Sequence, residues 1–240
     1  MGAIGVQALL VYARAAQQVR QGRGSLGEAV VESVSFYRKA LLHAHERIAE
    51  VGMTTLGTGR RIATCSFSST LMPLFSLSRP AAGFIGDGAP LGDGLKAAAQ
   101  MAELRISVTV VPDSAVASVV DKVDMVVIGA DQVLSNGAVV NRTGSLPLAL
   151  SADHFGIPVY VACQKLKVSG IDQRDLVLEM LPPELVSHPA STLSHAALFE
   201  VIPAALITRI FTEEGPLGAM DIADISRELS SLRRKLILCG

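Results

Sequence analysis

The chain has 240 residues, enough for one large α/β domain with a small helical region before it. Half of it is hydrophobic and only 18% is charged, against about 25% in an average soluble domain, so we expect a large core and buried contacts between subunits. The formal net charge is −1, and without a basic surplus to neutralise a phosphate backbone, nucleic-acid binding is not expected.

The first third of the chain has helical patterns. Residues 4–20 form the first of these. Ser25, followed by Glu28, gives a capping-box pattern, and the apolar residues behind it keep a helical spacing as far as Gly52. We therefore expect a helical N-terminal region, residues 1–57.

From residue 58 onward, strand and helix patterns alternate. Strands are expected at residues 60–66, 83–87, 106–113, 124–131 and 157–163. Helices are expected at residues 92–104, 114–123 and 144–156. The alternation predicts an α/β domain, residues 58–240, whose parallel sheet is covered by helices on both faces.

The last part of the chain has three patterns. The proline-rich residues 182–203 are interpreted as a loop, and residues 204–215 as a short helix or strand. From Asp221 a final helix is expected, because apolar residues recur at steps of three and four. They are Ile222, Ile225, Leu229, Leu232 and Leu236.

Cysteine usage and the N-terminus bear on the cellular setting. The three cysteines, Cys65, Cys163 and Cys239, form no CxxC pair, and the histidine spacing gives no zinc pattern. We expect no metal, no cofactor and a reduced, cytoplasmic setting. The apolar residues 2–13 are fewer than the ~20 that span a bilayer and lack the basic start of a secretion signal, so no membrane association is expected.

Asp131 is the first candidate for a functional residue. It directly follows an apolar strand pattern, and ligands of parallel sheets bind outside the carboxyl ends of the strands. In the alternative interpretation, its carboxylate caps the turn that begins there by accepting backbone amides.

The segment at residues 127–163 resembles the central signature of one superfamily. Further motifs at residues 46–70, 106–116 and 199–215 agree with it in order. This superfamily holds the α, β and δ regulatory subunits of eukaryotic initiation factor two-B, together with methylthioribose-1-phosphate isomerase and ribose-1,5-bisphosphate isomerase. The resemblance implies a Rossmann-like sheet after a short helical region, and homodimers or larger homo-oligomers.

The resemblance also implies candidate catalytic residues. The isomerases use a cysteine after the first strand and the aspartate matched by Asp131 to move protons between adjacent sugar carbons. When Ser68 and Ser69 match the family's small polar, ligand-binding pair, Ser66 takes the place of the cysteine and Cys65 falls one residue early. A serine needs an adjacent base to lose its proton, and Cys65 has the alternative role of a small buried residue.

The expected phosphate ligands follow later strands. Asn141 and Arg142 stand where the family has Asn-Lys, and Lys167 matches a family lysine after the fifth strand. We expect the three to converge on one anionic sugar phosphate; their alternative roles are surface charge and turn formation.

Three departures from the family pattern concern phosphate binding. The family's phosphate-binding arginine is either displaced to Arg79 or replaced by Ala89, which the spacing favours. The glycine-rich residues 86–94 either cradle an anion through backbone amides or form a plain loop. A second family arginine would precede Met1, so we expect that either this chain begins late or its phosphate site has changed.

Two main hypotheses follow. The first is a sugar-phosphate-binding protein of the aldose–ketose isomerase type, which converts a pentose 1-phosphate to its ketose with a partly degenerate active site. The second is a non-catalytic protein that resembles the regulatory subunits and binds a sugar phosphate or nucleotide. Asp131 favours the first, and the substitutions at Ser66 and Ala89 favour the second. A third hypothesis is an α/β scaffold without a ligand.

Overall fold

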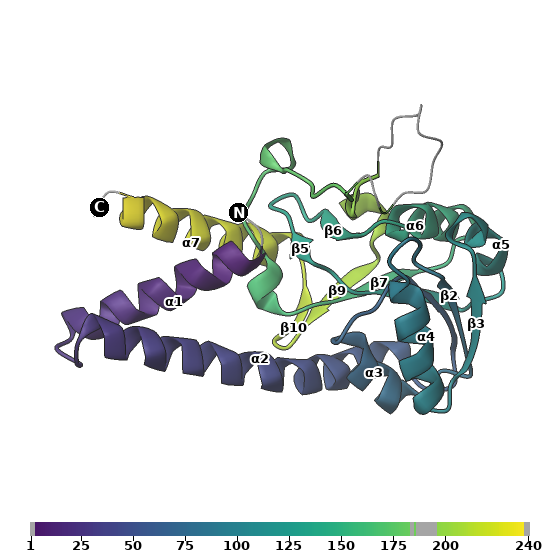
Figure 1. Ribbon diagram of the computed structural model, residues 1–240, viewed down its shortest axis with the longest axis horizontal. Helices are drawn as coiled ribbons and strands as arrows, with labels where there is room; N and C mark the ends of the chain where they lie inside the picture. Colours follow the sequence, from purple (N-terminus) through teal and green to yellow (C-terminus); the bar gives the residue numbers. More distant parts are fainter. Residues whose placement is uncertain (1–2, 183–184, 186–195, 238–240) are drawn as a thin grey trace.

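The computed structural model describes residues 3–182, 185 and 196–237 and is built around a seven-stranded sheet in the order β10-β9-β7-β4-β1-β2-β3 (Figure 1). The strands are β1 (Arg61–Thr64), β2 (Ala82–Gly86), β3 (Ser107–Val111), β4 (Met125–Ile128), β7 (Val159–Ala162), β9 (Arg209–Thr212) and β10 (Gly215–Leu217). Every neighbouring pair is parallel except β9 and β10, which are antiparallel. The predicted Rossmann-like parallel sheet is therefore confirmed.

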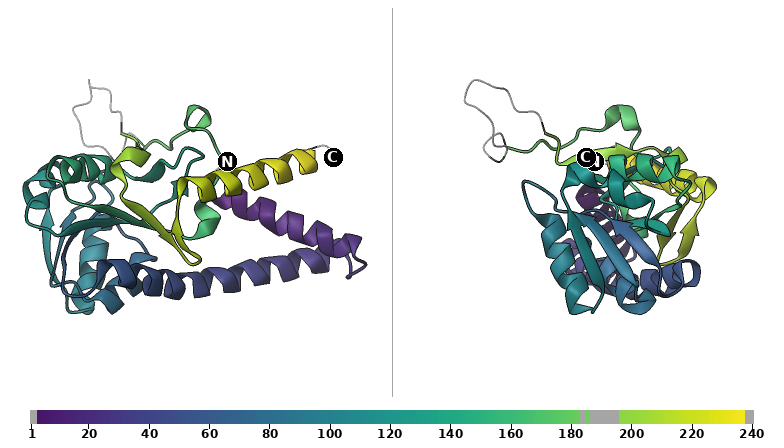
Figure 2. Two further views of the ribbon diagram at one scale, coloured as in Figure 1. Left: turned by 180° about the vertical axis from the view of Figure 1, so that it is seen from behind. Right: turned by 90° about the vertical axis from the view of Figure 1, so that its right-hand side faces the viewer.

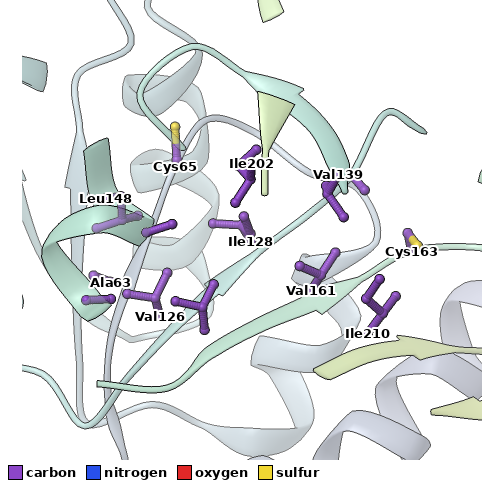
Figure 3. Packing of buried hydrophobic residues seen from close by; sticks show 14 of the residues in the cluster. Ala63, Cys65, Val126, Ile128, Val139, Leu148, Val161, Cys163, Ile202 and Ile210 are labelled. Carbon is purple, nitrogen blue, oxygen red and sulfur yellow. The ribbon is translucent and has the colours of Figure 1, made fainter. Parts of the chain in front are cut away.

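Helices cover both faces of this sheet, as the continuous apolar strands require. On one face lie α2 (Leu26–Leu56), α3 (Leu71–Ser78) and α4 (Asp93–Glu103), whose buried side chains join those of β1 and β4 in one core cluster. On the other face lie α5 (Ala117–Val120) and α6 (Ser145–His154), which share a second cluster with the same strands (Figure 3). The helix expected at residues 114–123 is shorter than predicted, because its first turn is the 3-10 helix η1 (Asp113–Ala115).

A second, three-stranded antiparallel sheet was not predicted. It consists of β5 (Gln132–Val133), β6 (Val139–Arg142) and β8 (Phe199–Ile202), in the order β5-β6-β8. The loop prediction for residues 182–203 is thus wrong at β8, while residues 183–184 and 186–195 lie outside the described part of the chain. These strands form because Val133, Val139 and Ile202 are buried against the main sheet.

The helical N-terminal region consists of α1 (Ala3–Arg20) and α2. The capping box is confirmed, with the Ser25 side chain accepting from Glu28 N–H and the Glu28 carboxylate accepting from Ser25 N–H. The predicted end at Gly52 is wrong. Gly52 lies inside the helix, where a Cβ would come 2.9 Å from Leu74 Cδ1, and the helix ends at Gly57, which has φ 66°.

The final helix α7 (Ala219–Ile237) lies beside α1, and together with α2 these two helices extend beyond one end of the sheet (Figures 1 and 2). Val6 and Leu9 of α1 share a small buried cluster with Leu229 of α7. The domain boundary at residue 58 stays a prediction. In the described ranges no helix is long and apolar enough to cross a membrane.

Candidate functional site

The candidate site lies at the carboxyl ends of the central strands. Cys65 and Ser66 follow β1, Asp131 follows β4, and Lys167 follows β7 within the 3-10 helix η2 (Lys165–Lys167). Since β7, β4 and β1 are adjacent and parallel, these segments leave the sheet at one edge. A cavity of about 580 Å³ opens beside Cys65 and Ser66.

Cys65 is buried at the rim of the core cluster (Figure 3). Its thiol donates to the Thr143 carbonyl at 3.7 Å, and Gly144 must lack a side chain there, since a Cβ would lie 3.1 Å from the Cys65 sulfur. Burial is the main cause that raises the pKa of Cys65 to about 12. The group is therefore a thiol at neutral pH and a poor nucleophile.

Ser66 lines the same cavity as Cys65. On a regular strand two consecutive side chains would point to opposite faces. Here β1 ends at Thr64 and Ser66 has a left-handed φ of 60°, so the strand alternation is interrupted and both side chains reach the cavity. Cys65 and Ser66 are therefore both available to a ligand in this cavity.

Asp131 is half-buried, and its backbone N–H donates to the Val140 carbonyl at 2.9 Å. Burial raises the pKa of its carboxyl group, while the positive charges of Lys167 and Arg142 act in the opposite direction. Lys167 Nζ donates to the carbonyl of Ala130. The structure thus places the acid within the field of two cations.

The turn after Asp131 has its own hydrogen bond. Asn136 Oδ1 accepts from the Ala138 N–H at 3.0 Å, and Leu134 N–H donates to the Ala138 carbonyl. Among the described residues, no hydrogen bond from this turn ends on the Asp131 carboxylate. Turn capping by Asp131 therefore receives no support.

Asn141 and Arg142 lie on β6 rather than after a strand, and as consecutive strand residues they point to opposite faces. Asn141 is buried and donates to Ser145 Oγ at 2.8 Å. Arg142 lines the cavity, where its Nη2 atom lies 2.6 Å from Asp93 Oδ2. Of the three expected ligands, Arg142 and Lys167 both lower the pKa of Asp131 by their charge, whereas the Asn141 amide is engaged with Ser145.

The two serines of the small polar pair differ in position. Ser68 lies against Gly129, where a Cβ would come 2.7 Å from Ser68 Oγ, and this places it between the ends of β1 and β4. Ser69 is exposed. Only Ser68 is therefore close to the strand end that leads to Asp131.

The two candidates for the missing arginine are far apart in the fold. Ala89 follows β2 and lines the cavity. Arg79 ends α3, and its carbonyl accepts from the Gly59 N–H, before the start of β1. Arg79 therefore lies at the opposite edge of the sheet and does not supply the cation that Ala89 lacks.

In the glycine-rich segment, residues 86–94, two backbone N–H groups donate to aspartate side chains of the protein itself. Gly88 N–H donates to Asp113 Oδ1 at 3.2 Å, and Ala89 N–H donates to Asp87 Oδ1 at 3.4 Å. Burial raises the pKa of Asp113. Because carboxylates of the protein already occupy these amides, the segment gives no support to the predicted anion cradle.

Three site residues were missed by the sequence analysis. The positions of Asp93 and Glu200 near the site are apparent only from the three-dimensional structure. Glu200, on β8, accepts a hydrogen bond of 2.6 Å from the Leu146 N–H at the start of α6. His45, on α2, lies with its Nε2 atom 2.5 Å from Gln164 Nε2, and Gln164 also contacts Thr70 Oγ1 at 3.3 Å. None of the three residues belongs to a motif that could have marked it in the sequence.

These observations can be compared with known proteins. Residues 5–219 match the model of the initiation factor 2 subunit family. The chain belongs to this family.

Its relatives include two kinds of isomerase. Methylthioribose-1-phosphate isomerase of Rhodopirellula baltica is 31% identical over 186 residues, covering 70% of this chain and 52% of the relative. Ribose 1,5-bisphosphate isomerase of Haloferax volcanii is 27% identical over 217 residues, covering 85% and 67%. The chain thus spans about half the length of the first relative.

Solved structures of both branches share the fold. The translation initiation factor eIF-2B of Pyrococcus horikoshii has a TM-score of 0.70 and 24% identity, covering 80% of this chain and 69% of that chain. The 5-methylthioribose 1-phosphate isomerase of the same organism has a TM-score of 0.70 and 21% identity, covering 91% and 68%. This fold is common to catalysts and to initiation-factor subunits, so function has to be argued from the site.

Proposed function

We propose that the chain is a sugar-phosphate-binding protein of the aldose–ketose isomerase type, with a partly degenerate active site. The observation that carries this proposal is the position of Asp131, half-buried at the end of β4 and under the influence of both Lys167 and Arg142. A carboxyl group with a raised pKa between two cations suits a proton-transferring residue beside an anionic substrate.

The proposed roles follow from the surroundings of each group. Asp131 moves the proton between the adjacent sugar carbons. The ammonium group of Lys167 donates one hydrogen to the Ala130 carbonyl and has two more with which to bind the phosphate. Arg142 also binds the phosphate once its ion pair with Asp93 is broken. Cys65, which stays protonated, or Ser66 takes the part of the family's cysteine. Ser68, Ser69 and Asn141 are further ligand candidates from the resemblance.

The names of the relatives support the same reaction class, because both isomerases are named for ribose 1-phosphates. We also propose that the protein acts in the cytoplasm as a homodimer or larger homo-oligomer, without metal or cofactor.

The alternative is a non-catalytic sugar-phosphate or nucleotide binder that resembles the regulatory subunits. The ion pair between Arg142 and Asp93 favours this alternative, because it neutralises the charge of a side chain that would otherwise bind the phosphate. The missing arginine at Ala89 favours it as well.

An isomerase assay decides between the two. The purified protein is incubated with a panel of pentose 1-phosphates, and ketose formation is followed by NMR. We expect conversion by the native protein and its loss in Asp131→Asn, while Asp121→Asn, at an exposed aspartate, serves as the control. Tight binding without conversion in the native protein would establish the alternative, and no binding at all would refute both.

A further inference from the structure

The strand β3 forms an open edge of the main sheet. It is the last strand in the order β10-β9-β7-β4-β1-β2-β3, pairs on one side with β2 and lies at the outer edge of the sheet in Figure 1. Among the described elements, its main contacts are with β2 and α4. The other side of β3 is thus available to a further strand.

The outward backbone groups of this edge belong to two residues. The Val111 carbonyl, at the end of β3, accepts from the Asp87 N–H that follows β2. Backbone groups alternate between the two sides of a strand, so every second residue counted back from Val111 also faces β2. Val108 and Val110 therefore direct their N–H and C=O groups to the open side.

The edge has few of the features that normally prevent sheets from pairing. The sequence of β3 is SVTVV, without a charged residue, and the Val110 side chain is 39% exposed. Uncharged, exposed edges pair readily with another strand. The pairing region is short, because the Ile106 N–H donates to the Met101 carbonyl and Pro112 has no N–H.

An apolar side of α4 lies next to this edge. The exposed residues Leu95, Ala99 and Ala102 recur at steps of four and three, so they share one side of the helix. Another side carries Lys96, whose ammonium nitrogen lies 4.2 Å from the centre of the Phe67 ring in the loop after β1. Because β1 lies on the inner side of β2, the side with Leu95 faces outward, toward β3.

The exposed valine of β3 belongs to the same surface. The side chain of Val108 packs against the core cluster that α2, α3 and α4 share, so it lies on the α4 face of the sheet. Val110 is two residues further along and points to the same face. Val110, the apolar side of α4 and the outward backbone groups together form one surface, which we call the β3 edge surface.

We propose that the β3 edge surface binds a second copy of the chain, with the two β3 strands antiparallel about a two-fold axis at Thr109. In this register Val108 lies opposite Val110 of the partner subunit, and all their outward backbone groups are bonded. The same axis places the α4 helices of the two copies side by side, where Ala99 is small enough for a close approach.

Coverage and charge favour a second copy over a bound peptide. An extended peptide would satisfy the backbone groups of β3 but leave the apolar side of α4 exposed, whereas a second copy covers both. The antiparallel arrangement also brings the exposed Arg105, before each strand, toward the half-buried Asp113 that follows the strand of the other copy. Such a contact uses the open edge of both copies and closes the assembly.

This inference rests on the proposed homo-oligomer and is independent of the proposed reaction. Sedimentation equilibrium of the native protein and of Val110→Lys and Ala99→Glu tests it. Both substitutions place a charge in the interface, so we expect the dissociation constant to rise roughly hundredfold and the mass of the assembly to halve. Val31→Lys, at a 68% exposed position on α2, should leave the mass unchanged.

The possible results separate the proposals. A native protein that is a monomer at every concentration would overturn both the interface and the homo-oligomer, while the isomerase assay still decides the reaction. An assembly of unchanged mass in both variants would overturn the interface and leave the homo-oligomer standing. Isolated β3 peptide that bound the native protein without dimerisation of the full chain would assign the edge to a peptide partner and overturn the inference.

Cysteine crosslinking tests the register. Thr109→Cys places two thiols at the axis in a non-hydrogen-bonded pair, whose Cα atoms are about 4.5 Å apart and within reach of a disulfide. We expect a disulfide-linked dimer under mild oxidation, above the level that the native cysteines give. Ser107→Cys, exposed on the same strand, should give none, because its copies lie roughly 14 Å apart. A crosslink through residue 107 and none through residue 109 would refute the two-fold axis at Thr109.

Discussion

At the residue scale, His45 joins the N-terminal region to the site. Its Nε2 atom meets the buried amide of Gln164, which comes two residues after the end of β7. Burial lowers the pKa of His45, the charge of Lys167 lowers it further, and Glu213 acts in the opposite direction. Neutral His45 accepts a hydrogen from the Gln164 amide, whereas protonated His45 would need the amide to turn its oxygen inward.

This contact predicts a pH dependence of stability. Because the folded-state pKa of His45 is lowered, the unfolded chain binds the proton more readily. This contribution to the free energy of unfolding is lost as pH falls below about 6.5, the pKa of an unperturbed histidine. We expect His45→Gln to lose less stability than the native protein between pH 7.5 and 5.5. Urea denaturation at both pH values measures the difference.

The matched control for this experiment is His43→Gln, at an exposed position two residues away. It should follow the native protein. An equal loss of stability in His45→Gln and the native protein would contradict the assigned role, since titration of other buried carboxyl groups is common to both.

The site was predictable from sequence only in part. Asp131 could be located because it follows a recognisable apolar strand, and Arg142 and Lys167 because they match positions of the family motifs. Asp93 could not be recognised as a partner of Arg142, because the contact depends on how the glycine-rich loop folds onto the start of α4. His45 carried no signal, since a histidine on a helix with apolar spacing looks like any half-buried side chain.

At the element scale, the glycine-rich loop sets the wall of the cavity. Gly94, in the first turn of α4, approaches the end of β2 so closely that a Cβ would lie 1.8 Å from the Gly86 carbonyl oxygen. The approach is between backbone atoms, which cannot move aside as a flexible side chain would. Glycine at this position therefore determines where Ala89 to Leu91 lie.

Substitution of Gly94 tests this packing. Gly94→Ala should lower the free energy of unfolding by about 2–3 kcal/mol, because α4 must move away from β2. Gly27→Ala, near the start of α2 with no atom within 4 Å of the added Cβ, should instead raise it by roughly 0.5 kcal/mol. Chemical denaturation of both variants gives the comparison, and a Gly94→Ala protein of native stability would refute the close approach.

The helices and strands differ in how well the sequence predicts them. The central strands were found because each is a short apolar run between turn signals. β8 was missed because it lies in the proline-rich residues 182–203, which are typical of a loop, and β5 and β6 because the Asn-Gly turn between them dominates that stretch of the sequence. The end of α2 was misplaced at Gly52 because a glycine needed for packing against α3 has the same sequence signature as a helix cap.

At the scale of the whole molecule, α1 and α7, from opposite ends of the described chain, bury each other's apolar side chains. Leu9 and Leu229 are buried in the cluster that joins the two helices. We expect Leu9→Ala and Leu229→Ala each to cost about 2 kcal/mol of the free energy of unfolding. The double variant should lose less than the sum by about 0.5–1 kcal/mol, since the first substitution already loosens the shared contact.

A double-mutant cycle by urea denaturation measures this coupling, and Leu42→Ala, at an exposed position on α2, serves as the control with almost no effect. Additive losses from the Leu9 and Leu229 substitutions would mean that the helices do not stabilise each other.

The pairing of α1 with α7 has a consequence for how the protein is made. During translation α1 is synthesised before the sheet, while its partner α7 emerges only after the whole sheet has been synthesised. The side of α1 that packs against α7, which includes Val6 and Leu9, is therefore without this partner until α7 has been synthesised, although α1 can already pack against α2. The nascent chain has to keep this side from associating with other molecules until the final helix arrives.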